Sequence, residues 1–312
     1  MNSVMTTRRL AGAPVVTDLR RQIDGYLAAS GSGRFRPVLA TVAIGLDEAS
    51  ASYRGSIERT FAKVGIDHLA MDLPGDSDAA AVIATLRRLN ADPGVTGILV
   101  FMPLPDHLSS TVVLDTLDPL KDVDGITPVS QGRLRLGLPS LQPSCPLGGI
   151  ELLTHYEFDI AGAAAVVVGR SPVVGGPLAT MLTHRHATVT IVHRQTRDVG
   201  ALTRDADLVC LAAGSPALLT REMVRAGVVV VDFGTTMDEG SIRGDADHDG
   251  LAGHIAGLSP VPGGTGPVTA YTLARNVCFA RIAQLAGSLD ATPNPDRSYG
   301  AAVGAANDVG DR

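Results

Sequence analysis

Apolar strand-like runs and amphipathic helix-like segments alternate along the first half of the chain. Apolar and β-branched residues predict strands at 37–45 and 97–101, and helical spacing predicts helices at 17–30, 51–65 and 78–90. Alternation of strands with helices of this length is typical of a parallel sheet covered by helices. We therefore predict that the first half is an α/β domain.

The second half repeats this alternation after a passage dense in proline and glycine at 137–148. Such a passage is typical of a domain boundary. Beyond it, near-continuous apolar runs predict four strands, at 163–168, 187–192, 207–212 and 227–232. Buried runs of this kind, separated by helices, predict a small doubly wound, Rossmann-like sheet.

Composition narrows the classes of function. The 312 residues, 45% of them hydrophobic, are enough for two domains with separate cores. A net charge of -6 leaves no excess of basic residues for a nucleic-acid partner, and no apolar run reaches the ~18 residues of a membrane span. Cys145, Cys210 and Cys278 are spaced like neither a disulfide framework nor a metal site. We expect a cytoplasmic protein without a metal ion.

A glycine-containing turn follows the first strand of the second half. It holds Gly169, Arg170, Ser171, Val174 and Gly175. Between a strand and a helix, such a turn lets phosphate oxygens approach the backbone N–H groups of the helix start. The turn lacks the Gly-x-Gly-x-x-Gly pattern, so taken alone it could equally be ordinary turn chemistry.

The residues after the next strand bear on the choice of cofactor. An NAD site usually has an acid there, whereas arginine accommodates the 2′-phosphate of NADP. The chain has His193 and Arg194 at this point and no carboxylate. Arg170 and Arg194 are the candidate phosphate ligands, although either could simply lie on the solvated surface. The pattern favours NADP over NAD, and His193 and Thr236 complete the candidate cofactor-binding residues.

Six motifs spread over the chain carry a resemblance to a known family. They are Gly45-Leu-Asp-Glu-Ala-Ser50 followed by Tyr53, Pro103-Leu-Pro105, Lys121-Asp-Val-Asp-Gly125, Pro143-Ser-Cys-Pro-Leu-Gly148, Val168-Gly-Arg-Ser-Pro-Val-Val-Gly-Gly-Pro177 and Pro260-Val-Pro-Gly-Gly-Thr-Gly-Pro267. Together they resemble the bifunctional methylenetetrahydrofolate dehydrogenase/cyclohydrolase family. The resemblance implies an oxidoreductase of one-carbon metabolism that takes a tetrahydrofolate derivative and NADP, and a homodimer.

The resemblance also implies a domain plan with a cleft between the two domains. Residues 1–145 together with a returning helix at 268–286 would form the folate-side domain, and 146–267 the Rossmann-like domain. The stretch 287–312 is rich in Gly, Pro, Asp and Ala without periodicity. We expect a disordered tail there.

Three places in the chain correspond to the family's substrate site. Tyr53 matches the aromatic residue that stacks along the aminobenzoyl part of folate. Asp124 matches the carboxylate that faces the pterin ring, whose adjacent N–H and NH₂ groups form a bidentate donor pair. Pro262, Gly263 and Gly264 belong to a loop that resembles the segment closing the pocket. Without the resemblance, these would be a half-buried tyrosine, a solvated acidic loop and a rigid connector.

Two positions depart from the family pattern. The resemblance implies a lysine four residues after the tyrosine and a glutamine before the Pro103-Leu-Pro105 run, and the chain has Ile57 and Phe101 instead. Ile57 should share a helix face with Tyr53 and point into the pocket. The family uses the missing pair for the cyclohydrolase step, and neither replacement can donate, accept or relay a proton.

These departures favour an NADP-dependent methylenetetrahydrofolate dehydrogenase with weak or absent cyclohydrolase activity. Hydride transfer depends mainly on positioning, whereas hydrolysis gains about 10²–10⁴-fold from a positioned acid or base. Two alternatives stay open: an oxidoreductase repurposed for another carbon–nitrogen substrate in specialised metabolism, and a non-catalytic folate- or nucleotide-binding protein. Arg54 could replace the lysine, although a guanidinium is a poor proton shuttle.

Overall fold

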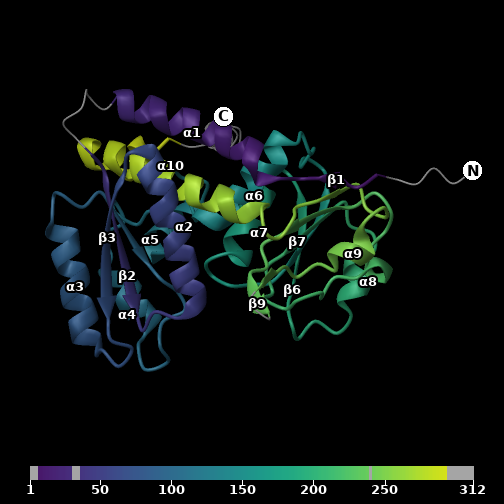
Figure 1. Ribbon diagram of the computed structural model, residues 1–312, viewed down its shortest axis with the longest axis horizontal. Helices are drawn as coiled ribbons and strands as arrows, with labels where there is room; N and C mark the ends of the chain where they lie inside the picture. The colour runs from purple at the N-terminus through teal and green to yellow at the C-terminus, as the bar shows by residue number, and fades with distance from the viewer. Residues whose placement is uncertain (1–5, 30–35, 239–240, 294–312) are drawn as a thin grey trace, which may run out of the picture. The chain divides into compact units, whose positions relative to one another are not determined.

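The computed structural model describes residues 6–29, 36–238 and 241–293 (Figure 1). The chain divides into two compact units. Among the described residues, unit 1 contains 6–17, 145–238 and 241–269, and unit 2 contains 18–29, 36–144 and 270–293. Three of the described helices belong partly to each unit, since the divisions fall inside α1 (Gly12–Ala29), after the first residue of α6 (Ser144–His155) and inside α10 (Thr265–Ala286).

Unit 2 contains a three-stranded parallel sheet in the order β3-β2-β4. The strands are β2 (Val38–Ile44), β3 (Asp67–Leu73) and β4 (Gly97–Val100). The central strand β2 and its neighbour β4 are almost entirely buried, as their apolar runs predict. The edge strand β3 has no fully buried residue, so the pattern of hydrophobic positions does not predict it.

Four helices accompany this sheet: α2 (Glu48–Val64), α3 (Ala79–Ala91), α4 (Ser110–Thr116) and α5 (Pro128–Arg135). In Figure 1, α2 and α3 flank the strands. Aspartates at the N-caps set where these two helices begin, because the side chains of Asp47 and Asp78 accept from the N–H groups of Ser50 and Ala81, at 2.7 and 2.8 Å.

Unit 1 contains a six-stranded sheet in the order β1-β11-β8-β7-β5-β6, with every pair parallel. Its strands are β1 (Arg8–Arg9), β5 (Ala164–Val168), β6 (Thr188–Val192), β7 (Leu208–Leu211), β8 (Val229–Asp232) and β11 (Gly257–Leu258). The valines and leucines of the central strands form its core. Four of these strands, β5, β6, β7 and β8, coincide with the four strands predicted from the apolar runs.

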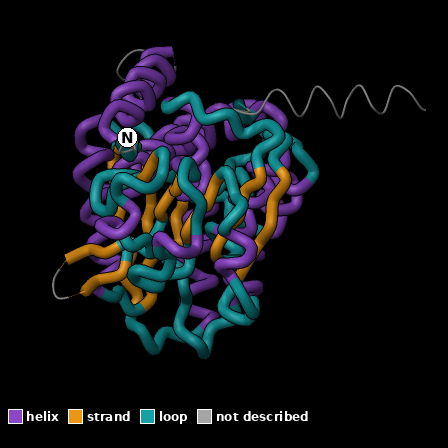
Figure 2. Tube along the Cα trace, turned by 90° about the vertical axis from the view of Figure 1, so that its right-hand side faces the viewer, coloured by secondary structure: helices purple, strands orange, loops and turns teal. Residues whose placement is uncertain are grey.

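Shorter elements of unit 1 surround this sheet. Figure 2 shows strands in orange with helices in purple beside them. The helices are α6 (Ser144–His155), α7 (Gly175–His184), α8 (Val199–Thr203), α9 (His248–Leu251) and a 3₁₀ helix at Arg221–Met223. An antiparallel hairpin of β9 (Thr236–Asp238) and β10 (Ser241–Arg243) follows β8. No helix of the described residues is long and apolar enough to cross a membrane.

The observed division differs from the predicted domain plan at the N-terminus. The prediction assigned residues 1–145 to the folate side, whereas the segment before residue 18 belongs to unit 1. Its backbone adds a strand to the unit 1 sheet, because the N–H of Arg8 donates to Ala256 O (2.8 Å) and that of Leu10 to Leu258 O (2.9 Å). A two-residue strand is too short to give a sequence pattern.

The predicted disordered tail is wrong for its first seven residues. Leu289–Ala291 forms a 3₁₀ helix, the side chain of Leu289 is buried, and Asp290 makes an ion pair with Arg133 of α5. This contact within unit 2 orders the stretch despite its polar composition. The remainder of the predicted tail, from residue 294 onward, lies outside the described residues.

Candidate active site

The two carboxylates of the Lys121–Gly125 segment have different environments. Asp122 has no exposed surface and accepts from the N–H groups of Ile126 (3.0 Å) and Thr127 (2.8 Å) and from the hydroxyl of Ser130 (2.7 Å). Burial raises the pKa of Asp122, and these hydrogen bonds oppose the rise. Asp122 therefore organises the loop and has no free face for a ligand.

Asp124 is only half buried, and it is held by Ser144. The backbone N–H of Ser144 donates to Asp124 Oδ1 at 3.2 Å, and the Ser144 hydroxyl donates to the same oxygen. Burial raises the pKa of Asp124 to about 6; the bonds from Ser144 lower it, and the charge of Asp122 raises it further. No donor among the described residues reaches the other oxygen, Oδ2, so this atom can accept from a ligand.

Backbone packing fixes the place of this carboxylate. Gly125 has a φ of +59°, and a Cβ there would lie 2.5 Å from Leu141 O. The amide of Asn276, on α10, donates to both Val123 O (2.8 Å) and Gln142 O (2.7 Å). The segments carrying Asp124 and Ser144 are thus joined by a buried side chain, a contribution that the sequence analysis missed because it comes from a distant helix.

The structure brings Tyr53 and Phe101 together. Their ring centroids lie 6.1 Å apart in an edge-to-face arrangement, with Tyr53 half buried and Phe101 8% exposed. Ile57, one turn after Tyr53, has no exposed surface. The expectation that Ile57 points into an open pocket is therefore wrong: its side chain is part of the core beneath α2. Both departing positions are therefore apolar: Phe101 meets the Tyr53 ring, and Ile57 is buried in the core.

Of the arginines on α2, Arg59 is exposed and Arg54 is already engaged. Arg54 makes an ion pair with Asp72 on β3. The chain has two lysines. Lys63 is exposed, and the buried Lys121 amine donates to Leu89 O (2.9 Å) and Asp92 O (2.6 Å) at the end of α3. The alternative in which Arg54 replaces the lysine loses its support.

The glycine turn of unit 1 has the close backbone packing that a phosphate site requires. Gly169 has a φ of +130°, and a Cβ there would lie 2.2 Å from Ala212 O. A Cβ at Gly175, the first residue of α7, would lie 2.2 Å from Gly169 O. The Ser171 hydroxyl accepts from the N–H groups of Val174 (3.1 Å) and Gly175 (3.4 Å). The turn therefore brings strand end and helix start together without side chains between them.

The charge around this turn suits an additional phosphate. Arg170 and Arg194 are exposed beyond the ends of β5 and β6. Neither has an ion pair with any described residue, and the segment that directly follows β6 carries no acid. His193 lies beside Arg194, and its Nδ1 accepts from Gln195 N at 3.3 Å. The donor set fits a dinucleotide that carries a 2′-phosphate.

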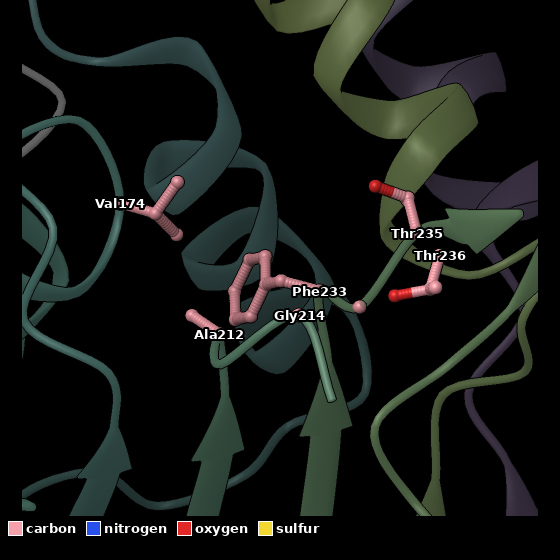
Figure 3. A pocket seen from close by; sticks show the side chains of 7 residues that line it. Val174, Ala212, Gly214, Phe233, Thr235 and Thr236 are labelled. Atoms are coloured by element: carbon pink, nitrogen blue, oxygen red, sulfur yellow. The ribbon is translucent and has the colours of Figure 1, made fainter. Parts of the chain in front are cut away.

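A pocket of about 200 Å³ lies beyond the ends of β7 and β8 (Figure 3). Its walls include the predicted Val174 and Thr236 and five residues that sequence reasoning missed: Ala212, Gly214, Phe233, Gly234 and Thr235. In Figure 3 the Phe233 ring stands between Val174 and the two threonines. The missed residues sit on loops without a motif, and their shared position after parallel strands was the available signal.

Pro262, Gly263 and Gly264 lie in unit 1, whereas Tyr53 and Asp124 lie in unit 2. The loop is tightly packed at the start of α10. Gly263 has a φ of +102° and its carbonyl accepts from Gly12 N at 2.8 Å, and a Cβ at Gly264 would lie 2.6 Å from Pro260 O. Its role in substrate binding stays a prediction.

The fold and the unit 1 site define a protein with a Rossmann-like nucleotide-binding unit and a second α/β unit built on a three-stranded sheet. Family models give this class a name. Residues 10–124 match the catalytic domain of tetrahydrofolate dehydrogenase/cyclohydrolase, and residues 143–285 match its NAD(P)-binding domain. The chain belongs to the tetrahydrofolate dehydrogenase/cyclohydrolase family, which confirms the family predicted from the motifs.

Similar proteins span nearly the whole chain. The bifunctional protein FolD 2 of Frankia alni is 42% identical to this chain, and the match covers 93% of this chain and 100% of the relative. The bifunctional protein FolD of Thermomicrobium roseum is 43% identical, and the match covers 92% of this chain and 97% of the relative. The crystal structure of the bifunctional enzyme FolD from Campylobacter jejuni has a TM-score of 0.82 at 36% identity, covering 88% of this chain and 98% of that one. The predicted two-domain α/β class with parallel sheets is confirmed.

Proposed function

We propose that this protein is an NADP-dependent methylenetetrahydrofolate dehydrogenase whose cyclohydrolase activity is weak or absent. Family membership supports the oxidoreductase part. The observation that carries the second part is that both departing positions are apolar: Phe101 meets the Tyr53 ring, and Ile57 is fully buried beneath α2. A methenyl bridge held against hydrocarbon has no side chain there to deliver water or move a proton.

NADP is the cofactor that the unit 1 site fits best. The crystal structure of the Trypanosoma brucei family member is a complex with NADP and an inhibitor. It is 31% identical to this chain, with a TM-score of 0.82, and the match covers 87% of this chain and 96% of that one. In this chain, the Gly169 turn and the α7 start would hold the diphosphate, and Arg170 and Arg194 the 2′-phosphate. Bound NADP supplies a nicotinamide ring that accepts a hydride.

On the folate side, Asp124 would recognise the pterin ring. Its Oδ2 can accept from one pterin donor while Oδ1, already held by Ser144, accepts from the adjacent one. Tyr53, half buried, would stack along the aminobenzoyl part. These contacts orient the methylene bridge, and orientation is the main demand of hydride transfer, since the flanking nitrogen lone pairs stabilise the cation that forms.

The cyclohydrolase step has further requirements. Water must attack the methenyl carbon, and a proton must move between the two nitrogens. Of the cations on α2, Arg54 is paired with Asp72, and Arg59 and Lys63 are exposed. The Lys121 amine caps α3. Without a positioned acid or base, the step loses about 10²–10⁴-fold in rate, which leaves the methenyl product intact long enough to be released.

A repurposed oxidoreductase is the alternative that the replacement at position 101 supports, because an aromatic ring at Phe101 narrows the space beside Tyr53. Asp124, held in place by hydrogen bonds from Ser144, favours a folate substrate over this alternative, because its carboxylate matches the donor pair of a pterin ring. The test is NADP reduction by purified protein with methylenetetrahydrofolate, compared with an Asp124→Asn variant. Reduction that depends on Asp124 supports the proposal. A wild type that reduces no NADP above a control without enzyme contradicts it.

A further inference from the structure

Behind the nucleotide pocket, unit 1 contains two carboxylates that the chemistry proposed above does not use. Asp232 at the end of β8 and Asp245 after β10 are both 0% exposed. We propose that Asp245 is a positioning residue for the dinucleotide: it fixes the loop after β7, which forms one wall of the pocket, and so sets the affinity for the nucleotide. This inference rests on the proposed dinucleotide-binding function.

Asp245 holds three successive backbone groups of that loop. Its Oδ2 accepts from the N–H groups of Ala213 (2.7 Å) and Gly214 (3.0 Å), and its Oδ1 from that of Ser215 (2.7 Å). Ala212 and Gly214 line the pocket. Three adjacent N–H groups that point inward cannot be satisfied by a neighbouring strand, so the side chain determines the path of the loop.

The same loop supports the glycine turn. A Cβ at Gly169 would lie 2.2 Å from Ala212 O, so the backbone of the turn rests directly on the first carbonyl of the loop. Because the two backbones touch without intervening side chains, a shift of the loop after β7 must move the turn after β5. Asp245 thereby acts on the candidate phosphate site without contacting the nucleotide.

Asp232 connects the opposite wall to this arrangement. Its Oδ1 accepts from Gly234 N (2.8 Å) and from Asp245 N (3.0 Å), and its Oδ2 accepts from Ala246 N (2.9 Å) and lies 3.2 Å from His248 Nε2. A Cβ at Gly234, a residue of the pocket wall, would lie 2.5 Å from Asp245 N. The walls after β7 and β8 thus share one buried hydrogen-bond network with Asp245 at its centre.

Asp245→Asn tests the proposal with almost no change of shape. The three N–H donors approach both carboxylate oxygens, and an amide has an acceptor on one side only. Whichever way it turns, its NH₂ group faces at least one N–H group of the loop. We expect the dissociation constant for NADPH, measured by fluorescence on the full-length protein, to rise tenfold or more, while the KM for the folate substrate stays within about twofold.

Asp247→Asn is the matched control, since Asp247 lies two residues away and its side chain accepts, among the described residues, from Gly250 N alone (3.1 Å), at the start of α9. It should leave NADPH affinity within about twofold of the wild type. If Asp245→Asn lowers the melting temperature but leaves NADPH affinity equally unchanged, Asp245 is purely structural and the inference is overturned. A wild type that binds no NADPH overturns both the inference and the proposed function.

Amide hydrogen exchange in the wild type tests the same point without a variant that must fold. The N–H groups of Ala213, Gly214 and Ser215 lie in a loop yet are bonded to a buried carboxylate, so they should exchange slowly, and NADPH should slow them further. Exchange at the rate of an unstructured peptide would overturn the inference. So would rates that saturating NADPH leaves unchanged.

Discussion

At the scale of single residues, Asp124 and its partner Ser144 control how the proposed pterin contact depends on pH. Burial raises the pKa of Asp124 to about 6. The carboxylate accepts two hydrogen bonds when ionised, above this pKa, and loses acceptor capacity when protonated, below it. The folate-side contact should therefore be present at neutral pH and fail in mild acid.

This yields a prediction for catalysis. For the folate substrate, kcat/KM, which reports the free enzyme, should fall as pH decreases through about 6. Asp124→Asn should be weakly active at all pH values and should lack the acidic limb of the profile, which is the fall of kcat/KM at low pH. Steady-state rates between about pH 5 and 8 give the answer. A wild-type profile that is flat over this range would contradict the assignment of Asp124 as the pterin-binding acid.

Ser144→Ala should move that limb. The serine hydroxyl and N–H lower the pKa of Asp124 against the effect of burial, so removing the hydroxyl should shift the limb toward higher pH. Ser130→Ala is the matched control, because its hydroxyl serves the neighbouring Asp122 instead. It should cost about 1–3 kcal/mol of stability and leave the limb in place. Equal shifts in both variants would indicate a general loosening of the loop.

Residue-level contacts were also the least predictable from the sequence. Tyr53 and Asp124 could be named because they stand in motifs. Ser144 also stands in a motif, but its pairing with Asp124, 20 positions away, could not be predicted, and Phe233 stands in no motif. Asp245 receives its partners from a loop about 30 positions earlier. Pairings of this kind depend on how strands are ordered in the sheet, and a local pattern does not encode that order.

At the scale of elements, helix α2 carries Ile57 where the family pattern has a lysine. Because Ile57 lies on the buried face of the helix, a charged side chain at this position should lower the free energy of unfolding. Ile57→Lys places an amine where no surface is exposed, so the free energy of unfolding should fall by about 3 kcal/mol or more. Ile57→Met, which keeps the position apolar, should cost less than about 1.5 kcal/mol. Chemical denaturation measures both. A lysine variant as stable as the methionine variant would show that this face of α2 opens to solvent.

The loop after β6 carries the predicted cofactor preference. Arg194→Ser should raise KM for NADP about tenfold, the effect of losing a hydrogen bond to a charged group, with little change for NAD. Arg197→Ser, three positions along the same exposed loop, is the control and should leave both values near those of the wild type. If Arg197→Ser alone raises KM for NADP, the 2′-phosphate belongs to that arginine instead.

Periodicity predicted the elements that are long or buried. The runs behind β2, β4, β5, β7 and β8 are apolar because both faces of those strands are covered, whereas the edge strand β6, also matched by a run, is mostly exposed. The sequence analysis did not predict the exposed edge strand β3 or the two-residue strands β1 and β11. An exposed edge strand, or a strand of two residues, does not require an apolar run. Helix α10 was placed only through the family resemblance.

At the scale of the whole molecule, family membership and the two-unit α/β architecture agree with the motifs, while the placement of residues before 18 in unit 1 corrects the domain plan. A homodimer and a cytoplasmic location stay predictions. The central claim concerns the chemistry of the whole chain: it oxidises the methylene bridge and then releases the methenyl product without hydrolysing it.

One reaction tests that claim most directly. Purified protein is given methylenetetrahydrofolate and NADP, and NADPH and methenyltetrahydrofolate are followed together. The account predicts one methenyltetrahydrofolate for each NADPH formed, which then decays at the rate measured without enzyme. Methenyltetrahydrofolate that disappears faster in proportion to the enzyme added would contradict it, and would mean that Ile57 and Phe101 in place of the lysine and glutamine do not abolish the cyclohydrolase step.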